Sequence, residues 1–414
     1  MMRAVELHFA VPLAIFAFTY LVFAIGNFPG LQLDRTGAAL AGALLMVATG
    51  SLSESRALAA IDFHTLLLLF GMMIIVANLR VSGAFGLVAR WLLERAHAGY
   101  AMLAMTVLAS GVLAAFFIND VVCLALAGPL IEVARILDID ASPLLLALAS
   151  GSNIGSVATI TGNPQNMIVA GFAGIGYSAF AARMAPLALA SLVVDYAVIA
   201  WLYHGRLSRI RRRDDLHLPA PPPERRWHLI KSSIVAAVVL LLFAMGYPTH
   251  LVALGGGAAL LFTRHTQPRS IYEQIDWTLL VMFAGLFIVV KGAETTHLLK
   301  DLVQVVGPER FKDVAVLSIA AGALSNLVSN VPAVLLFKPI YPQISQGMVT
   351  GLVLASASTL AGNLTLLGSM ANLIVIEQAR RDGVEIGFVE YLRVGLPVTA
   401  ITLALGIAWL RFLG

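Results

Sequence analysis

Polar residues interrupt four apolar stretches of this sequence, and these breaks hold the groups best suited to bind small ions. The first stretch, residues 100–137, breaks at Asn119-Asp120, and Asp120 is the only carboxylate between Glu94 and Glu132. A lone carboxylate in an apolar segment is costly and is a functional hypothesis by default. We interpret Asp120 as a proton carrier or a cation ligand; the alternative is a structural partner for amide or backbone N–H groups.

The second break carries many hydroxyl and amide groups. It runs from Ser150 to Asn166 within the stretch 141–173 and includes a Gly-Asn-Pro sequence at 162–164. Proline removes a backbone donor and glycine permits strained turns, so we expect a helix to unwind here. The unwound residues would hold an oxyanion or its coupling ion. The alternative is that small polar residues allow helices to pack closely.

The remaining two breaks lie in the second half of the chain. One, at 329–332 within the stretch 314–346, contains a proline. The other, at 356–372 within the stretch 349–376, has none and is expected to unwind less sharply. Breaks in membrane helices expose helix N-termini that attract anions and carbonyl groups that coordinate cations.

The two halves of the chain resemble each other. At a shift of 206 residues, 144–169 matches 350–375 at 10 of 26 positions, and at a shift of 213, 65–76 matches 278–289 at 6 of 12. Shared Leu, Ile and Val mean little in apolar sequence, but shared Ser, Thr, Gly and Asn mean more. We therefore infer an internal repeat.

The composition excludes a water-soluble protein. Of 414 residues, 59% are hydrophobic and 12% are charged, whereas an average soluble domain has about 25% charged residues. A single cysteine, Cys123, excludes an intrachain disulfide, and the histidines form no HExxH motif. Without a nucleophile–base or metal constellation, we expect neither enzymatic activity nor a cofactor. The net charge of +4 is expected to set membrane topology rather than to bind nucleic acid.

These features predict an all-α polytopic membrane protein with about ten transmembrane helices. Each half, 1–204 and 232–414, is expected to hold five crossings, a re-entrant hairpin and an unwound helix. Because five is odd, the two halves would face opposite ways as an inverted repeat. Hairpin arms of 17–19 residues are also long enough to span, which leaves two more crossings per half open.

The segment 205–231 is basic, rich in proline and expected to be a cytoplasmic linker; a site for lipid head groups is the alternative. This topology puts 18 Lys and Arg inside and 8 outside, in agreement with the positive-inside rule. Both termini would then lie outside. We expect a multi-pass protein of a bacterial-type inner membrane.

The order of these motifs resembles the ion transporter superfamily. Asn119-Asp120 is followed by Pro129 and then by Gly-Asn-Pro-Gln-Asn at 162–166. The superfamily includes divalent-anion/sodium symporters, arsenite permeases, sodium/proton antiporters, the melanosomal P protein and proteins with a citrate-transporter-like domain. The resemblance covers nearly the whole chain in architecture, and its specific motifs are confined to the four breaks.

The resemblance implies an elevator-type transporter that forms homodimers, with a scaffold domain and a moving domain that contains the two hairpins. The motifs form a mosaic. Asn119-Asp120 resembles arsenite permeases, 162–166 resembles the anion symporters, and 358–397 resembles the P protein. The second hairpin keeps Ser329-Asn330 of the symporter signature but has valine in place of threonine. The motifs therefore resemble one superfamily, but they do not indicate a single solute.

The breaks and the resemblance together predict a solute site and a site for the coupling ion, Na⁺ or H⁺. The candidate solute-binding residues are Asn119, Ser152, Asn153, Thr161, Gly162, Asn163, Ser329, Asn330, Ser358, Thr359, Asn363 and Thr365. The candidate residues for the coupling ion are Asp120, Asn119, Thr159, Asn166, Asn330, Gly368 and Asn372. Beyond Na⁺, no metal is expected.

Two functions fit this pattern. The first is a cation-coupled secondary active transporter of a small anion, either a carboxylate or an oxyanion. The second is an arsenite/antimonite efflux permease or a Na⁺/H⁺ antiporter, in which Asp120 exchanges a proton. The first needs the solute and the cation to bind together, whereas the second needs them to compete. The expected partners are a small anionic or oxyacid solute, membrane lipid and a second copy of the chain.

Overall fold

The protein is a bundle of membrane-type helices. The computed structural model describes residues 2–26, 30–95, 99–208, 223–262, 267–296, 304 and 307–414, and this part of the chain is helical and contains no strand. Within the described ranges, six helices, α4, α6, α10, α12, α15 and α22, are long and apolar enough to cross a membrane, and five shorter apolar helices accompany them. The expected all-α membrane fold is confirmed.

Each half of the chain contains one helical hairpin and one interrupted helix. The first half contains α1 (Met2–Ile25), α2 (Arg35–Ala48), α3 (Glu54–Ala60), α4 (Phe63–Val81), α5 (Ala84–Arg95), α6 (Gly99–Phe116), α7 (Asn119–Leu137), α8 (Ser142–Ser156), α9 (Pro164–Ala173), α10 (Tyr177–Leu202) and α11 (His204–Leu207). The hairpin is α6–α7, and the interrupted helix is α8–α9, with a short 3-10 turn at Ile160–Gly162 between its parts.

The second half repeats this order. It contains α12 (Pro223–Ala244), α13 (Thr249–Leu261), α14 (Pro268–Tyr272), α15 (Trp277–Glu294), α17 (Val314–Val328), α18 (Asn330–Phe337), α19 (Tyr341–Ile344), α20 (Met348–Ala361), α21 (Met370–Arg381) and α22 (Phe388–Leu413). Here the hairpin is α17–α18, and a 3-10 turn at Leu366–Gly368 interrupts α20–α21. Of the linker expected at 205–231, residues 209–222 lie outside the described residues.

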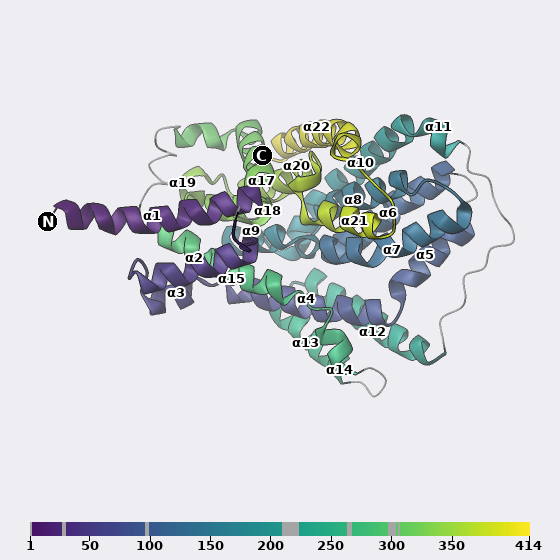
Figure 1. Ribbon diagram of the computed structural model, residues 1–414, viewed down its shortest axis with the longest axis horizontal. Coiled ribbons are helices and arrows are strands. Elements are labelled where there is room, and N and C mark those ends of the chain that lie inside the picture. The colour runs from purple at the N-terminus through teal and green to yellow at the C-terminus, as the bar shows by residue number, and fades with distance from the viewer. Residues whose placement is uncertain are drawn as a thin grey trace.

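The helices sort into two groups that draw on both halves. Helices α1, α2, α4, α12, α13 and α15 pack on one another and form what we call the scaffold bundle. The hairpins, the interrupted helices, α10 and α22 form the hairpin bundle. In Figure 1, α4, α12 and α13 run along the lower edge, while α10, α20 and α22 lie along the upper edge.

The two hairpins enter from opposite faces. Hairpin α6–α7 begins and ends beside the linker, because Tyr100 bonds to His204 and Asp140 pairs with Arg206. Hairpin α17–α18 begins at Asp313, whose carboxylate is 2.9 Å from the guanidinium of Arg411 at the far end of α22. The backbone N–H of Val316 and this arginine hold the pKa of Asp313 below its usual range. Since α22 starts at the linker face, the halves form an inverted repeat.

The structural register of the repeat differs by one residue from the register expected for α4 and α15. A side chain on Gly71 would meet the backbone of Ala253 at 2.5 Å, and one on Gly285 would meet that of Ala39 at 2.7 Å. Gly71 and Gly285 are 214 residues apart, and so are Ala39 and Ala253, whereas the expected shift of the repeat was 213. The shift of 213 matched one threonine and five common apolar residues, whereas the close crossing depends on one glycine in each helix.

This crossing gives a prediction about folding. Gly71→Ala forces the backbones of α4 and α13 apart, and overpacking of this kind costs about 1–3 kcal/mol. We expect a lower midpoint of thermal unfolding in detergent. Gly255→Ala in α13 is the matched control, because nothing lies within 4 Å of its added methyl group. Equal midpoints for the two variants would contradict the close crossing.

Candidate functional site

A cavity of about 490 Å³ lies where both hairpin tips meet the interrupted helices and the scaffold bundle. We call it the tip cavity. The hairpin tips line it with Asn119, Asp120, Ser329 and Asn330; the interrupted helices contribute Asn163, Gln165 and Ser369; and the scaffold contributes Asp34, Arg35 and Asp276. Segments far apart in the chain therefore bring these polar groups together in a single chamber, whose remaining lining is mostly apolar.

Three helices begin at the tip cavity without a side-chain cap. They are α7, α9 and α18, which start at Asn119, Pro164 and Asn330. The first N–H groups of a helix have no partner within the helix, and together with the helix dipole they favour a bound anion. This end of the chamber can therefore stabilise negative charge through its backbone.

The turns of the two hairpins lie in the first residues of the expected breaks. The first hairpin turns at Phe117-Ile118, so Asn119 and Asp120 belong to the first turn of α7 rather than to the break itself. The second hairpin turns at Ser329, whose φ of +76° is rare for a residue other than glycine. Such a conformation costs about 1–3 kcal/mol, so the packing of both arms must hold it.

Asn153 is the hub of a buried amide network behind the cavity. Its Nδ2 donates to Oδ1 of Asn363 at 2.8 Å and of Asn372 at 2.9 Å. Its Oδ1 accepts from Nδ2 of Asn119 at 2.8 Å and from Oγ of Ser369 at 3.0 Å. The network joins the first hairpin tip to both interrupted helices, and it leaves Oδ1 of Asn119 buried with no hydrogen-bond partner among the described residues.

Two equivalent asparagines close the gaps in the interrupted helices. Asn166 donates to the carbonyls of Ser156 and Thr159 at 2.8 and 2.9 Å. Asn372 donates in the same way to Gly362 and Thr365 at 2.9 and 3.1 Å. The two sets are 206 residues apart, which is the shift expected from the sequence. Asn166 Oδ1 is also buried without a partner in the described part of the chain.

Several expected site residues support the cavity from behind instead of lining it. Ser152, Ser358 and Thr359 donate to carbonyls within their own helices. Thr159 donates to the Ala115 carbonyl, and Thr161 shares hydrogen bonds with Thr159 and Tyr177. Gly162 and Gly368 have no room for a side chain, since an added Cβ would meet a carbonyl oxygen at 2.4 and 2.7 Å. Thr365 contributes a carbonyl to Asn372.

Seven polar residues that line the cavity were not among the sequence candidates. Five come from the scaffold bundle: Asp34, Arg35, Thr36, Asp276 and Thr278. Asp34 and Asp276 accept from the backbone N–H three residues later and so cap α2 and α15, a pattern that reads as ordinary helix capping. Gln165 and Ser369 also line the chamber, and Gln165 bonds to Thr359 at 2.7 Å. No feature of the sequence indicates that these scaffold residues lie beside the hairpin tips.

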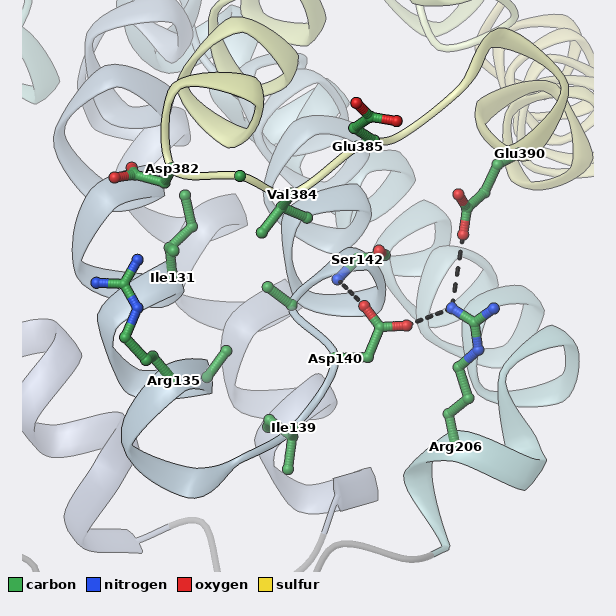
Figure 2. A pocket seen from close by; sticks show the side chains of 13 residues that line it. Ile131, Arg135, Ile139, Asp140, Ser142, Arg206, Asp382, Val384, Glu385 and Glu390 are labelled. Carbon is green, nitrogen blue, oxygen red and sulfur yellow. Dashed lines mark hydrogen bonds and ion pairs between the residues drawn. The ribbon is translucent and has the colours of Figure 1, made fainter.

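A second cavity, of about 480 Å³, is lined by charged residues at the linker face. Figure 2 shows Arg206 reaching both Asp140 and Glu390, while Asp382 and Glu385 lie on the loop before α22. The Arg206 guanidinium is 3.6 Å from the Glu390 carboxylate. These contacts join the ends of α7, α11 and α22, and none of the expected site residues lines this cavity.

The sequence matches known transporters over nearly its full length. The family model described as "Citrate transporter" matches residues 18–352. The chain belongs to the citrate transporter family. It is 30% identical to a 46 kDa membrane protein of Mycobacterium leprae, covering 97% of this chain and 99% of that protein. It is also 30% identical to the silicon efflux transporter LSI3 of Oryza sativa subsp. japonica, covering 92% and 93%.

More distant similarities agree with this family. The putative transporter arsB of Dictyostelium discoideum is 23% identical, covering 93% of this chain and 88% of that protein. The crystal structure of the Alcanivorax borkumensis YdaH transporter, which has an unusual topology, matches with a TM-score of 0.57 at 15% identity. That match covers 98% of this citrate transporter family member and 97% of the YdaH chain, and it supports the fold. The protein is a membrane transporter.

Removal of one gap-closing amide gives a second prediction. Asn372→Ala leaves the carbonyls of Gly362 and Thr365 and the amide of Asn153 without this partner. An unmet buried group costs about 1–3 kcal/mol, so we expect a clear fall in the midpoint of thermal unfolding in detergent. Gln378→Ala, on the exposed part of the same helix, is the control. If both variants melt like the wild type, the amide does not hold the interrupted helix.

Proposed function

We propose that this protein is a cation-coupled secondary active transporter of a small carboxylate or oxyanion, with the tip cavity as its solute site. One observation carries the proposal: three uncapped helix N-termini converge on a chamber lined by amide and hydroxyl groups. Backbone N–H groups in this arrangement suit an anion. Arg35 adds the only Lys or Arg side chain among the described residues that line the chamber.

The coupling cation fits the oxygen-rich side of the same chamber. Asp120 lines the cavity beside the start of α21, near the backbone N–H of Ala371. The buried Oδ1 of Asn119, on the preceding residue, has no partner in the described structure. Carboxylate and amide oxygens are ligands that hard cations prefer, and a carboxylate can alternatively carry a proton. We propose Asp120 as the residue that couples Na⁺ or H⁺ to the solute.

We also propose that the hairpin bundle moves as one body against the scaffold bundle. The amide network joins one hairpin tip to both interrupted helices. Contacts between the bundles are sparser; one is the hydrogen bond from the hydroxyl of Tyr20 to the carbonyl of Pro332, at 3.1 Å. A bundle held together by buried amides and loosely joined to its neighbour suits an elevator mechanism.

An uncharged oxyacid such as arsenite is the second candidate solute. Three carboxylates line the tip cavity, those of Asp34, Asp120 and Asp276, against the single arginine. This balance suits a neutral hydroxylated solute or a cation. The printed names of two relatives point the same way, a silicon efflux transporter and a putative arsB transporter. In this case Asp120 would exchange a proton or Na⁺ against the solute.

Transport by the purified protein distinguishes the two candidates. We would measure uptake of labelled succinate into proteoliposomes under an imposed Na⁺ gradient and then under a H⁺ gradient. Uptake driven by either gradient supports the anion symporter and identifies its coupling ion. Lack of succinate uptake together with gradient-driven arsenite flux would replace the first candidate with the second.

Asp120→Asn tests the coupling role. The substitution removes the charge with little change in shape, so we expect the fold to stay intact. Uptake driven by Na⁺ or H⁺ should fall at least tenfold, which corresponds to about 1.4 kcal/mol of lost interaction with the cation. Asp382→Asn, an exposed carboxylate at the linker face, is the matched control. Uptake by Asp120→Asn with unchanged dependence on pH and Na⁺ would rule out the assignment.

Arg35→Met tests the charge of the solute. Methionine keeps much of the aliphatic length but removes the cation that lines the tip cavity. A hydrogen bond to a charged group contributes about 1.5–3 kcal/mol, so we expect the KM for succinate to rise at least about tenfold, with arsenite flux unaffected. Arg380→Met on the exposed end of α21 is the control. An unchanged KM for succinate would mean that Arg35 does not contact the anion.

A further inference from the structure

A third cavity, of about 400 Å³, lies between α4, α9, α10, α12 and α13. We call it the far cavity, because it lies on the face opposite the linker. The carbonyl of Ala244, at the end of α12, accepts from Oγ of Ser178 at the start of α10, 2.6 Å away. Further along α10, the backbone carbonyl of Arg183 accepts a hydrogen bond from Nε1 of Trp409 near the end of α22, which is the end that faces away from the linker.

The far cavity is the repeat equivalent of the tip cavity. Asp62 caps α4 as Asp276 caps α15, at the structural shift of 214. Gly246 and Gly26 follow α12 and α1 with the same φ of +86°. Both members of each pair line their respective cavities. An inverted repeat therefore builds the same scaffold shape twice, once toward each face of the membrane.

The two cavities differ in their charged groups. The position equivalent to Arg35, at the start of α2, is Thr249 at the start of α13, which lines the far cavity. The far cavity is lined instead by two histidines, His64 of α4 and His250 of α13. Their ring centroids are 4.4 Å apart at an interplanar angle of 70°. The described lining of the far cavity contains no Lys or Arg.

We propose that the far cavity is a second anion-binding vestibule of the transport path, on the opposite face from the tip cavity, with His64 and His250 as its anion-binding groups. The proposal rests on the proposed function, because it assumes that the solute is an anion. The chemical class of ligand is a small carboxylate or oxyanion. At one face, the tip cavity would bind the anion through Arg35, which is always cationic. At the other face, the far cavity would bind it through His64 and His250, which become cationic in acid.

Protonation sets the affinity of this vestibule. An ordinary imidazole titrates near about 6.5, and two imidazolium rings in contact repel each other. A carboxylate bound beside both rings, in the far cavity that they line, offsets that repulsion, so anion binding and protonation favour each other. Binding at the far cavity should therefore strengthen as the pH falls, because acid favours the cationic form of imidazole.

The other titratable groups around the histidines do not replace this charge. Asp62 is bound to its own helix, accepting from N and Oγ1 of Thr65 at 3.2 and 2.7 Å. Tyr177 of α10 shares a hydrogen bond with Thr161 at 3.3 Å, and Tyr247 follows α12. Tyrosine is neutral below about pH 9. The lining residues contributed by α9 are Met167, Ala170 and Gly171, which carry no charge.

Cysteine labelling from each face tests the position of the vestibule without relying on transport. In a Cys123→Ser background, which removes the single native cysteine, Thr249→Cys lines the far cavity and Thr36→Cys lines the tip cavity. A membrane-impermeant maleimide should label the two variants from opposite faces of sealed vesicles. Labelling of both from the same face, or labelling of Thr249→Cys no faster than the buried native Cys123, would overturn the proposal.

Protection by succinate tests the ligand. Succinate should slow labelling of Thr249→Cys roughly tenfold better at about pH 5.5 than at about pH 7.5, because imidazole carries more positive charge in acid. The pair His64→Gln and His250→Gln should remove this difference, whereas His204→Gln at the linker face should keep it. Protection of Thr36→Cys but not of Thr249→Cys defeats this inference alone. Protection of neither variant, with no succinate uptake, defeats the proposed function as well.

Discussion

The architecture depends on two carboxamides that close gaps in the backbone. A helix interrupted inside a membrane leaves carbonyl groups that water cannot reach, and each would cost several kcal/mol if left unpaired. Asn166 and Asn372 each donate to two such carbonyls, at equivalent positions of the two repeats. With the carbonyl ends satisfied in this way, the N–H end of α9 remains available to a ligand, whereas the start of α21 is capped by the side chain of Ser369.

Most of the residues that support the interrupted helices are therefore different from those that line the tip cavity. The amides that stabilise the gaps lie behind the tip cavity, together with the glycines that permit close backbone contact. Asn153 connects the two repeats through Asn363 and Asn372, so the interrupted helices are held as one unit. Asn119 and Asn163 link the two roles, because they line the chamber and also donate to Asn153 and Ser156 behind it.

The proposed function depends on the places where the repeat is not symmetric. Asn119 and Asn330 begin α7 and α18 in the same way, but the next residue is Asp120 in one and Val331 in the other. One hairpin therefore has a carboxylate at this position and its counterpart does not. The scaffold bundle differs in the same way, because the equivalent first residue is the charged Arg35 in α2 and the neutral Thr249 in α13. A duplicated fold supplies the shape, and single substitutions assign charge to one face or the other.

The sequence by itself determined the membrane class, the breaks and the repeat, because apolar length, proline and paired Asn residues act locally along the chain. It also identified Asn119, Asp120, Asn163, Ser329 and Asn330, which do line the tip cavity. Only the tertiary structure decided the one-residue register and brought Asp34, Arg35 and Asp276 to the hairpin tips. Those residues read as ordinary helix starts in the sequence, and their role arises from the packing of helices that are hundreds of residues apart.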